Sequence, residues 1–584
     1  MGPFNKRKAT TMVCRIALSL CAMGAASLGI AAPAASESAK GDADRPNVLL
    51  IVADDLGYSD LGAFGGEIPT PNLDQLANQG MLLTNHYVTP TCSPTRAALM
   101  AGTDNHLAGL GTMGEYLPQA PKLQGKPGYE GYLNDRVYWL PEVMRDAGYH
   151  TYMAGKWHLG TKPEQWPVAR GFEHSFALIN GGGSHFAPVP GKPIFADRAQ
   201  YVEDDQRTEL PTDFYSSKSY TDKLIQYVKQ NHGDGKPFFA WAAYTAPHWP
   251  LHAPDEDIQK FKGQYAAGYE AIRAARLERL KSLGLMDEDA QPNLGLPKSK
   301  DYPSWDMLTP EEQANEARRM EVYAAMVHNM DRHVGRLIQT LKDLGEYDNT
   351  LVIFMSDNGA EATDSFFPPN ENTDNSVENI GRRLSNVGYG ARWAEVSATP
   401  FRLFKGYTAE GGISSPAFVR LPGQNGSTER INVPTHVTDI APTILDFAGI
   451  RLPEGNKYNG RAVSPMSGVT LAPVLKGDAS TEQLANRVLV GELFGGRYVR
   501  DGKWKLVSVM VPFAKNEWEL YDLEQDRSES HNVAAEHPEI VMQMVRLWDQ
   551  YVVQNGVVFA PNERMPDVRR GAKSEIKLPG AKAH

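Results

Sequence analysis

The sequence predicts an α/β fold: a large mixed, mostly parallel sheet flanked by helices, followed by a small C-terminal antiparallel sheet with a helix. Apolar runs rich in β-branched residues recur along the chain, and helical segments separate them. After about residue 485 the pattern changes to short strands with turn signals. Strands that alternate with helices are typical of a parallel sheet that helices bury on both faces.

The first strand is expected at residues 47–53, a continuous apolar run that is typical of a strand buried on both faces. Similar runs predict strands at 150–154, 237–243 and 350–355. The clearest helix begins after Thr309, a capping residue followed by Pro310 and, three residues after the cap, by Glu312. Apolar residues then keep helical spacing as far as Leu341.

Toward the C-terminus, short strands are expected at 497–500, 504–507 and 518–521, with a helix at 538–555. The region 255–305 is charged and irregular, and we expect an insertion near the mouth of the site. We therefore divide the chain into four parts: a signal peptide (1–34), a linker (35–45), a large α/β domain (46–484) and a C-terminal α+β subdomain (485–584).

The composition indicates a globular protein, since 41% of the 584 residues are hydrophobic and 9% are aromatic. The formal net charge is −11. An acidic chain of this kind is not expected to bind nucleic acid.

The N-terminus predicts export, to a bacterial periplasm. Basic residues precede an apolar stretch at 16–32, and Ala32-Pro33-Ala34 fits a cleavage site between small residues. The stretch is short for a membrane anchor and no later span resembles it, so no stable membrane association is expected. Cys21 offers a lipoprotein alternative, which Leu20 before it disfavours.

Cys92 is the only cysteine that remains once the predicted signal peptide is removed. A single thiol can form neither an internal disulfide nor a thiolate zinc cage. It is therefore either a small buried group or a reactive centre. The surrounding sequence is Thr91-Cys92-Ser93-Pro94-Thr95-Arg96.

Polar residues follow the predicted strands, at the edge where ligands bind in open α/β sheets. Taken singly, Asp54-Asp55 is often a helix cap or turn, Asp357-Asn358-Gly359 is a good turn sequence, and a lone histidine or lysine carries less weight still. Together they supply three carboxylates and an amide, the oxygen ligands that suit Ca²⁺ or Mg²⁺, and cationic side chains that suit an oxyanion. The residues in question are Asp54, Asp55, Lys156, His158, His248, Asp357, Asn358 and Lys405.

The Cys-x-Pro-x-Arg spacing closely resembles the signature of the sulfatases, in the alkaline-phosphatase-like superfamily. In that family the cysteine is oxidised to formylglycine (3-oxoalanine), the catalytic nucleophile. The resemblance runs from about Asn47 to the segment 520–523, and residues 102–113 look most like bacterial arylsulfatases. One departure is Ser414-Ser415, where many members have Arg-Val.

The resemblance assigns two groups of site residues and makes residues 46–484 the catalytic domain. The implied metal ligands are Asp54, Asp55, Cys92, Asp357 and Asn358. The implied catalytic residues are Cys92, Arg96, Lys156, His158, His248 and Lys405. One divalent cation is expected, Ca²⁺ in preference to Mg²⁺, together with a maturation enzyme that generates the formylglycine.

The implied activity is hydrolysis of sulfate monoesters, aryl sulfates in particular, to an alcohol or phenol and sulfate. One hydroxyl of the hydrated aldehyde attacks sulfur, and loss of the proton from the second then expels sulfate. By resemblance, Asp357 takes the first proton and His158 the second, Arg96 orients residue 92, and Lys156 bridges residue 92 and the sulfate. His248 and Lys405 would stabilise or protonate the departing oxygen.

Two alternatives stay open at this point. The first is a phosphonate or phosphate diester hydrolase of the same superfamily, some members of which also use formylglycine. The second is a non-catalytic protein that binds sulfated ligands through an unmodified Cys92.

Overall fold

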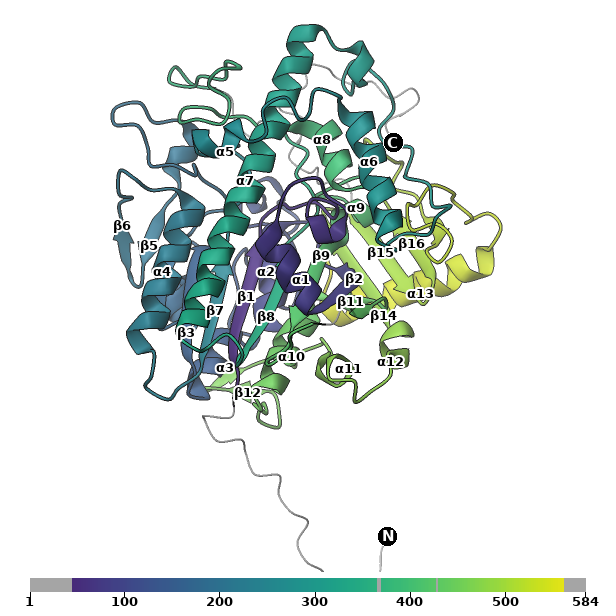
Figure 1. Cartoon of the computed structure of the whole chain (residues 1–584). Coiled ribbons are helices and arrows are strands. Elements are labelled where there is room, and N and C mark those ends of the chain that lie inside the picture. The colour runs from purple at the N-terminus through teal and green to yellow at the C-terminus, as the bar shows by residue number, and fades with distance from the viewer. Residues whose placement is uncertain (1–44, 365–368, 427–428, 561–584) are drawn as a thin grey trace, which may run out of the picture. The chain divides into compact units, whose positions relative to one another are not determined.

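The computed structural model describes residues 45–364, 369–426 and 429–560. The predicted signal peptide and all of the predicted linker except residue 45 lie outside these ranges. Within them the chain forms a mixed sheet of eleven strands, ordered β10-β2-β9-β8-β1-β7-β3-β4-β5-β6 with β11 beside β2 (Figure 1). These strands are β1 (Asn47–Ala53), β2 (Met81–Tyr87), β3 (His150–Lys156), β4 (His174–Leu178), β5 (Tyr201–Glu203), β6 (Gln206–Thr208), β7 (Phe238–Ala243), β8 (Thr350–Ser356), β9 (Ser414–Arg420), β10 (Glu429–Ile431) and β11 (Thr435–His436).

The four strands predicted in this domain are confirmed, and they are the four adjacent strands at the centre of the sheet. β1 pairs in parallel with β8 on one side and with β7 on the other, and β7 pairs in parallel with β3. Their carboxyl ends therefore meet at one edge. β9 runs antiparallel to β8 and to β2, which makes the sheet mixed.

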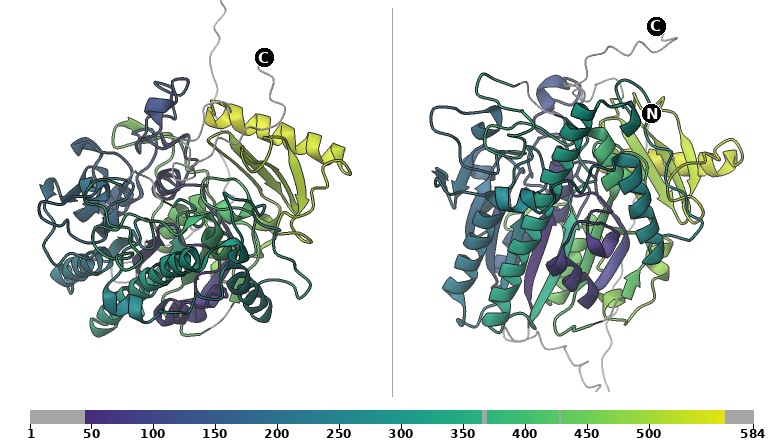
Figure 2. Two further views of the ribbon diagram at one scale, coloured as in Figure 1. Left: turned by 90° about the horizontal axis from the view of Figure 1, so that it is seen from above. Right: turned by 45° about the horizontal axis from the view of Figure 1, so that its top comes forward.

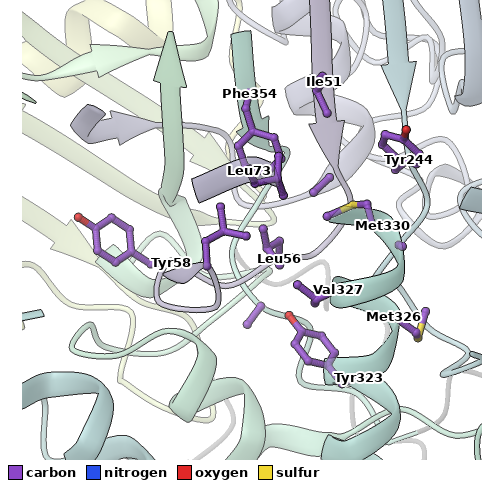
Figure 3. Packing of buried hydrophobic residues seen from close by; sticks show 14 of the residues in the cluster. Ile51, Leu56, Tyr58, Leu73, Tyr244, Tyr323, Met326, Val327, Met330 and Phe354 are labelled. Carbon is purple, nitrogen blue, oxygen red and sulfur yellow. The ribbon is translucent and has the colours of Figure 1, made fainter. Parts of the chain in front are cut away.

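Helices bury both faces of the sheet, as the continuous apolar runs predicted. In β1, Leu49 and Ile51 face one core, while Val48 and Leu50 face the other. The first core, part of which is drawn in Figure 3, packs against α1, α4 and α7, and the second packs against α2, α3 and α10. These helices are α1 (Pro71–Gln79), α2 (Cys92–Ala101), α3 (Leu140–Asp146), α4 (Ser216–Asn231), α7 (Pro310–Asp343) and α10 (Ile440–Phe447).

The long helix α7 begins where the capping sequence predicted. The Thr309 hydroxyl accepts a hydrogen bond from the Glu312 amide, and the Glu312 carboxylate accepts one from the Thr309 amide. This reciprocal pair satisfies two amides that a helix start leaves unbonded. Within the described ranges, no helix combines the length and hydropathy that crossing a membrane requires.

The region 255–305 is more regular than we expected. It contains the short helix α5 (Asp255–Gln259) and the longer α6 (Tyr269–Ser282), which packs against α8 (Gly390–Ser397). Most of the length of α6 is charged or small residues, so its apolar face is too narrow to stand out in the sequence. The buried positions Leu277 and Leu280 nevertheless keep helical spacing.

After residue 487 an antiparallel sheet of four strands forms, covered by α13 (Pro538–Asn555) (Figure 2). Its strands are β14 (Val488–Leu493), β15 (Gly496–Asp501), β16 (Trp504–Ser508) and β17 (Glu519–Asp522). Three of them and the helix were predicted, whereas β14 was not, because Gly491 and Glu492 interrupt its apolar pattern. Its core includes Val499, Leu506 and Trp548.

His106 joins the large domain to this C-terminal sheet. The His106 ring is buried; its Nδ1 lies 2.9 Å from Asp104 Oδ1 and its Nε2 lies 3.1 Å from Glu492 Oε2 on β14. Tyr551 of α13 donates a hydrogen bond to the second Asp104 oxygen. Burial alone would lower the pKa of His106, but Asp104 and Glu492 outweigh it and raise this pKa to about 9.

We therefore expect a stability loss at alkaline pH that depends on His106. The folded pKa lies above the value of about 6.5 for an unfolded histidine, so the contribution is complete below pH 6.5 and disappears as the pH rises through 9. It amounts to about 3 kcal/mol of unfolding free energy. Urea unfolding of the wild type and His106→Gln between pH 6 and pH 9.5 measures it. The curves should converge at high pH; a constant gap between them would contradict this role.

Candidate active site

The carboxyl ends of the central strands bring the predicted polar residues to one place. Asp54 and Asp55 follow β1, Asp357 and Asn358 follow β8, and Lys156 is the last residue of β3. Their neighbouring strands fix them: the Asp54 amide donates to the Ala246 carbonyl beyond β7, and the Asp357 amide donates to the Ala53 carbonyl. All of these side chains are buried.

Lys405 reaches the site by a different route from the one its position suggested. It does not follow a strand but lies in the loop between α8 and α9 (Glu410–Ile413), ahead of β9. Because β9 is antiparallel to β8, the start of β9 lies at the edge where β8 and β1 end. Lys405 Nζ lies 2.7 Å from Asp55 Oδ1.

Cys92 is the first residue of α2, and its thiol is buried. Sγ lies 3.8 Å from Asp55 Oδ1. Burial raises the thiol pKa well above its ordinary value, although Lys156 and Lys405 oppose the shift. Since the thiolate is the reactive form of cysteine, an unmodified Cys92 is a poor nucleophile here.

The acidic side chains around Cys92 fit a hard divalent cation. One ligand atom from each of Asp54, Asp55, Cys92 and His248 falls within 4.8 Å of the others. Burial raises the pKa of Asp55 to about 7 against the attraction of Lys405, so gathering these carboxylates is costly unless positive charge offsets it. Asn358 Oδ1 is buried without a hydrogen bond partner among the described residues, as a free oxygen ligand would be.

Arg96 and Lys156 hold two of these carboxylates. Arg96 donates from Nε to Asp357 Oδ2 at 2.8 Å and from a terminal nitrogen to the Lys156 carbonyl at 2.7 Å. Lys156 Nζ contacts both oxygens of Asp54, at 2.9 and 2.8 Å. Arg96 thus contacts Asp357, and the role toward residue 92 that the resemblance implies stays a prediction.

His248 and Lys405 both approach the Asp55 carboxylate. His248 Nδ1 lies 2.5 Å from the Trp249 carbonyl, which can only accept, so this nitrogen carries a proton. Its Nε2 lies 3.5 Å from Asp55 Oδ2. Burial holds the pKa of His248 well below its usual range, whereas the carboxylates around Lys405 hold the pKa of that ammonium well above its own, despite burial.

Two glutamates at the site were not predicted from the sequence. Glu361 Oε2 lies 2.9 Å from Lys405 Nζ, so Lys405 is shared between Glu361 and Asp55. Glu115 Oε1 lies 2.7 Å from His158 Nε2. Weak signals existed, because Glu361 follows Asp357-Asn358 by a few residues and Glu115 follows the arylsulfatase-like segment 102–113.

The Ser414-Ser415 pair forms local hydrogen bonds. Ser415 Oγ donates to the Ser356 carbonyl and accepts from the Ser356 amide, at 2.8 and 2.9 Å, which locks β9 to the end of β8. Ser414 Oγ donates to Glu410, a buried carboxylate that also pairs with Lys505 of β16. The pair therefore belongs to the packing behind the site.

Nine of the predicted site residues contact one another through these carboxylates, Asn358 by donating from Nδ2 to Asp55 Oδ1 at 2.7 Å. His158 lies beside them, within electrostatic range of Lys156 and Arg96. The sequence prediction thus brought together residues that the fold also brings together. The set comprises Asp54, Asp55, Cys92, Arg96, Lys156, His158, His248, Asp357, Asn358 and Lys405.

Comparisons with known proteins agree with this geometry. A sulfatase family model matches residues 46–450, and a model described as N-sulphoglucosamine sulphohydrolase, C-terminal, matches residues 401–552. The chain is 44% identical to an uncharacterized sulfatase of Schizosaccharomyces pombe, covering 89% of this chain and 96% of that protein. It is 43% identical to an arylsulfatase of Klebsiella aerogenes, covering 74% and 92%.

A solved structure shares the architecture. Ps i-CgsB in complex with k-i-k-neocarrahexaose superimposes with a TM-score of 0.62 at 25% identity, over 88% of this chain and 93% of that chain. The family match covers more than half of the present sequence, and the matched region contains every predicted site residue. The chain therefore belongs to the sulfatase family and is a sulfatase, an enzyme that hydrolyses sulfate esters.

Proposed function

We propose that this sulfatase hydrolyses aryl sulfates with one divalent cation and a formylglycine made from Cys92. The observation that carries the proposal is the environment of Cys92: a buried thiol beside a carboxylate cluster and two lysines. A buried thiol with a raised pKa is a poor nucleophile unless it is modified. The hydrated aldehyde would instead present hydroxyls to the same cluster.

Conversion of Cys92 requires a second protein, which we propose as a maturation enzyme. The change from CH₂–SH to CHO takes up water, releases hydrogen sulfide and removes two electrons and two protons from the side chain. The maturation enzyme must therefore supply an oxidant. Because Cys92 is buried in the folded chain, conversion is expected before folding is complete.

The cation would be held by Asp54, Asp55, Asp357, Asn358 and residue 92. When bound, it would withdraw charge from the attacking hydroxyl and from the sulfate oxygens. Carboxylate and amide oxygens favour Ca²⁺ or Mg²⁺, and a ligand set with this many protein oxygens favours Ca²⁺, because Mg²⁺ usually keeps several waters.

The charge and position of the other site residues suggest a separate role for each. Asp357 accepts the proton of the attacking hydroxyl, and Arg96 keeps that carboxylate in place. The ammonium groups of Lys156 and Lys405 neutralise the sulfate. His158 takes the second proton, and His248 with Lys405 assists the departing oxygen.

The arylsulfatase assignment is supported by the similarity to the Klebsiella enzyme and is tested by substrate rates. Purified protein should cleave 4-nitrophenyl sulfate far faster than bis(4-nitrophenyl) phosphate or a phosphonate monoester. Faster cleavage of the diester would favour the diester hydrolase alternative. Binding of a sulfated ligand with no cleavage of any ester would favour the non-catalytic alternative.

The role of His248 predicts an effect that depends on the leaving group. An electron-poor phenol leaves as a stable phenoxide, whereas an unactivated ester needs a proton or a positive charge at the oxygen. His248 Nδ1 is bonded to the Trp249 carbonyl, so the donor to the ester oxygen would be Nε2, which must first take up a proton; the negative charge of the bound sulfate favours this uptake. General acid assistance is worth about 10²–10⁴-fold, so His248→Ala should lose far more rate on unactivated esters. Lys405→Ala should show a mixed effect, because its charge would also contact the sulfate. The measurement is kcat/KM against leaving-group pKa for each variant.

His252 provides a matched control for that series. It is also a buried histidine beyond β7, but its ring nitrogens bond to the Ser385 carbonyl and the His185 amide and not to the carboxylate cluster. His252→Ala should lower all rates alike. An unchanged slope in His248→Ala, with residue 92 still converted, would rule out the assigned role.

We also propose that the enzyme is exported, to a periplasm, after cleavage near Ala34. The basic start, the apolar stretch and the Ala-Pro-Ala site support this. The N-terminal residue of protein recovered from the extracytoplasmic fraction should lie near Ser36, and recovery of the full-length chain from the cytosol would oppose export.

A further inference from the structure

The ring of His158 is held by a carboxylate on one side. Its Nε2 lies 2.7 Å from Glu115 Oε1, and a carboxylate oxygen at this distance accepts the N–H of a neutral imidazole. The contact fixes the tautomer that carries its proton on Nε2. Nδ1 is then unprotonated; it is buried and has no hydrogen bond partner among the described residues. A buried polar atom of this kind needs a partner, which the reacting group can supply.

Gly181, in the loop after β4, packs closely against another side of the His158 ring. A Cβ at this position would stand 2.6 Å from His158 Cε1 and 2.7 Å from Nε2. The φ of Gly181 is not in the left-handed region, so its backbone would accept alanine. Glycine is required here because the His158 ring leaves no room for a side chain. His158 itself has a φ of 57°, an unusual conformation for a residue with a side chain.

The loop that carries Glu115 is anchored in turn by the C-terminal sheet. The neighbouring Tyr116 packs edge-on against Phe494, in the turn between β14 and β15, with ring centroids 5.4 Å apart. Earlier in the same loop, His106 pairs with Glu492 of β14. The loop that positions Glu115 is therefore anchored by the C-terminal sheet, whereas His158 follows β3 of the large sheet.

We propose that Glu115 and Gly181 are positioning residues that hold His158 Nδ1 as the base for the second half of the reaction. This inference rests on the proposed function. In that step residue 92 carries the transferred sulfate on one oxygen and a hydroxyl on the other. The hydroxyl proton moves to Nδ1, its electrons form the C=O bond, and the C–O bond to sulfate breaks, so sulfate leaves with that electron pair. No oxidant or reductant is consumed.

The electrostatics agree with a base at this position. Burial lowers the pKa of His158, which keeps the ring neutral, while Glu115 acts in the opposite direction and preserves basicity. The Glu115 side chain is 49% exposed, so its negative charge is only partly desolvated. Glu115 can therefore be replaced without leaving a buried charge unpaired.

The test separates the two halves of the reaction with 4-nitrophenyl sulfate, whose first step is fast. In Glu115→Ala the steady-state rate should fall about 10- to 100-fold, the size of effect typical of losing a partner that orients a histidine. The initial burst of phenol should keep nearly its wild-type rate. The peptide containing residue 92, isolated from acid-quenched turnover, should then carry a sulfate group. Glu115→Gln keeps an acceptor for Nε2–H and should lose less.

Two variants serve as matched controls. Glu173 Oε2 lies 2.7 Å from His150 Nδ1 at the opposite end of β3, so Glu173→Ala breaks an equally short pair away from the site. A Cβ on Gly183 would meet the Ala199 Cβ at 2.6 Å, so Gly183→Ala imposes an equal clash without touching His158. Gly181→Ala should reproduce Glu115→Ala, and both controls should behave as the wild type.

Each outcome decides the inference. Accumulation of the sulfated peptide in Glu115→Ala and Gly181→Ala, but not in the controls, supports it. Burst and steady-state rates that fall together, or no sulfated peptide, would overturn it, provided that residue 92 is converted in each variant. If the wild type itself lacks the aldehyde, the proposed function fails instead. Should Glu115→Ala not fold, Glu115→Gln and Gly181→Ala give the same comparison.

Discussion

Cys92→Ala should abolish turnover, with a loss of at least about 10⁴-fold, while leaving the fold intact. In the proposed mechanism residue 92 supplies the nucleophile, and its neighbours only assist the attack. The substitution removes one small buried group at the start of α2, so the structural cost is modest. The rate of 4-nitrophenyl sulfate hydrolysis and the thermal unfolding midpoint give the two readouts.

Cys92→Ser provides the informative comparison. A serine hydroxyl can attack sulfur, but it lacks a second hydroxyl on the same carbon, so the sulfate ester that it forms has no internal route to release. This variant should become sulfated once and then stop. Sustained turnover by either variant would contradict the assignment of residue 92.

Asp54→Ala should lower cation content and rate together, by at least about 10²-fold in rate. Asp54 would be a direct ligand, and its loss would also leave the buried Lys156 ammonium without its carboxylate partner. Asp357→Ala should behave in the same way, because it would remove a second proposed ligand and removes the partner of Arg96. Elemental analysis of dialysed protein, alongside activity titrated with Ca²⁺ and Mg²⁺, measures both effects.

Asp331 offers a control for the loss of a buried aspartate. It accepts hydrogen bonds from the Asn72 and Leu73 amides at the start of α1, and none of its hydrogen bonds among the described residues joins the carboxylate cluster. Asp331→Ala should lower the stability but keep one cation per folded chain.

Stoichiometric zinc in the wild type, with activity restored by zinc alone, would contradict the expected hard-cation site.

The sequence predicted the centre of the fold because burial on both faces leaves a strong local signal. β1, β7 and β8 are almost entirely apolar and β3 is apolar in its middle, and polar site residues lie at the end of each strand or a few positions beyond it. Once four such strands are parallel, their ends must meet at one edge, so the position of Asp54 beside Asp357 follows from topology. The assignment of formylglycine and of individual roles rested on resemblance, which spacing alone could not supply.

What could not be predicted depends on contacts between distant segments. Glu115 lies on an irregular loop, and nothing in its spacing indicates that it reaches His158. Gly181 is one of three successive glycines, and only the packed structure shows that it meets an imidazole. Lys405 reaches the site because β9 reverses direction, a property of sheet order that no local pattern encodes.

The central claim is that residue 92 acts as an aldehyde, and the mass of the tryptic peptide ending at Arg96 tests it most directly. In active enzyme this peptide should have the mass of the aldehyde or its hydrate. The converted fraction should also track specific activity across preparations with different degrees of maturation. A fully active preparation whose peptide carries only the unmodified cysteine would contradict the account.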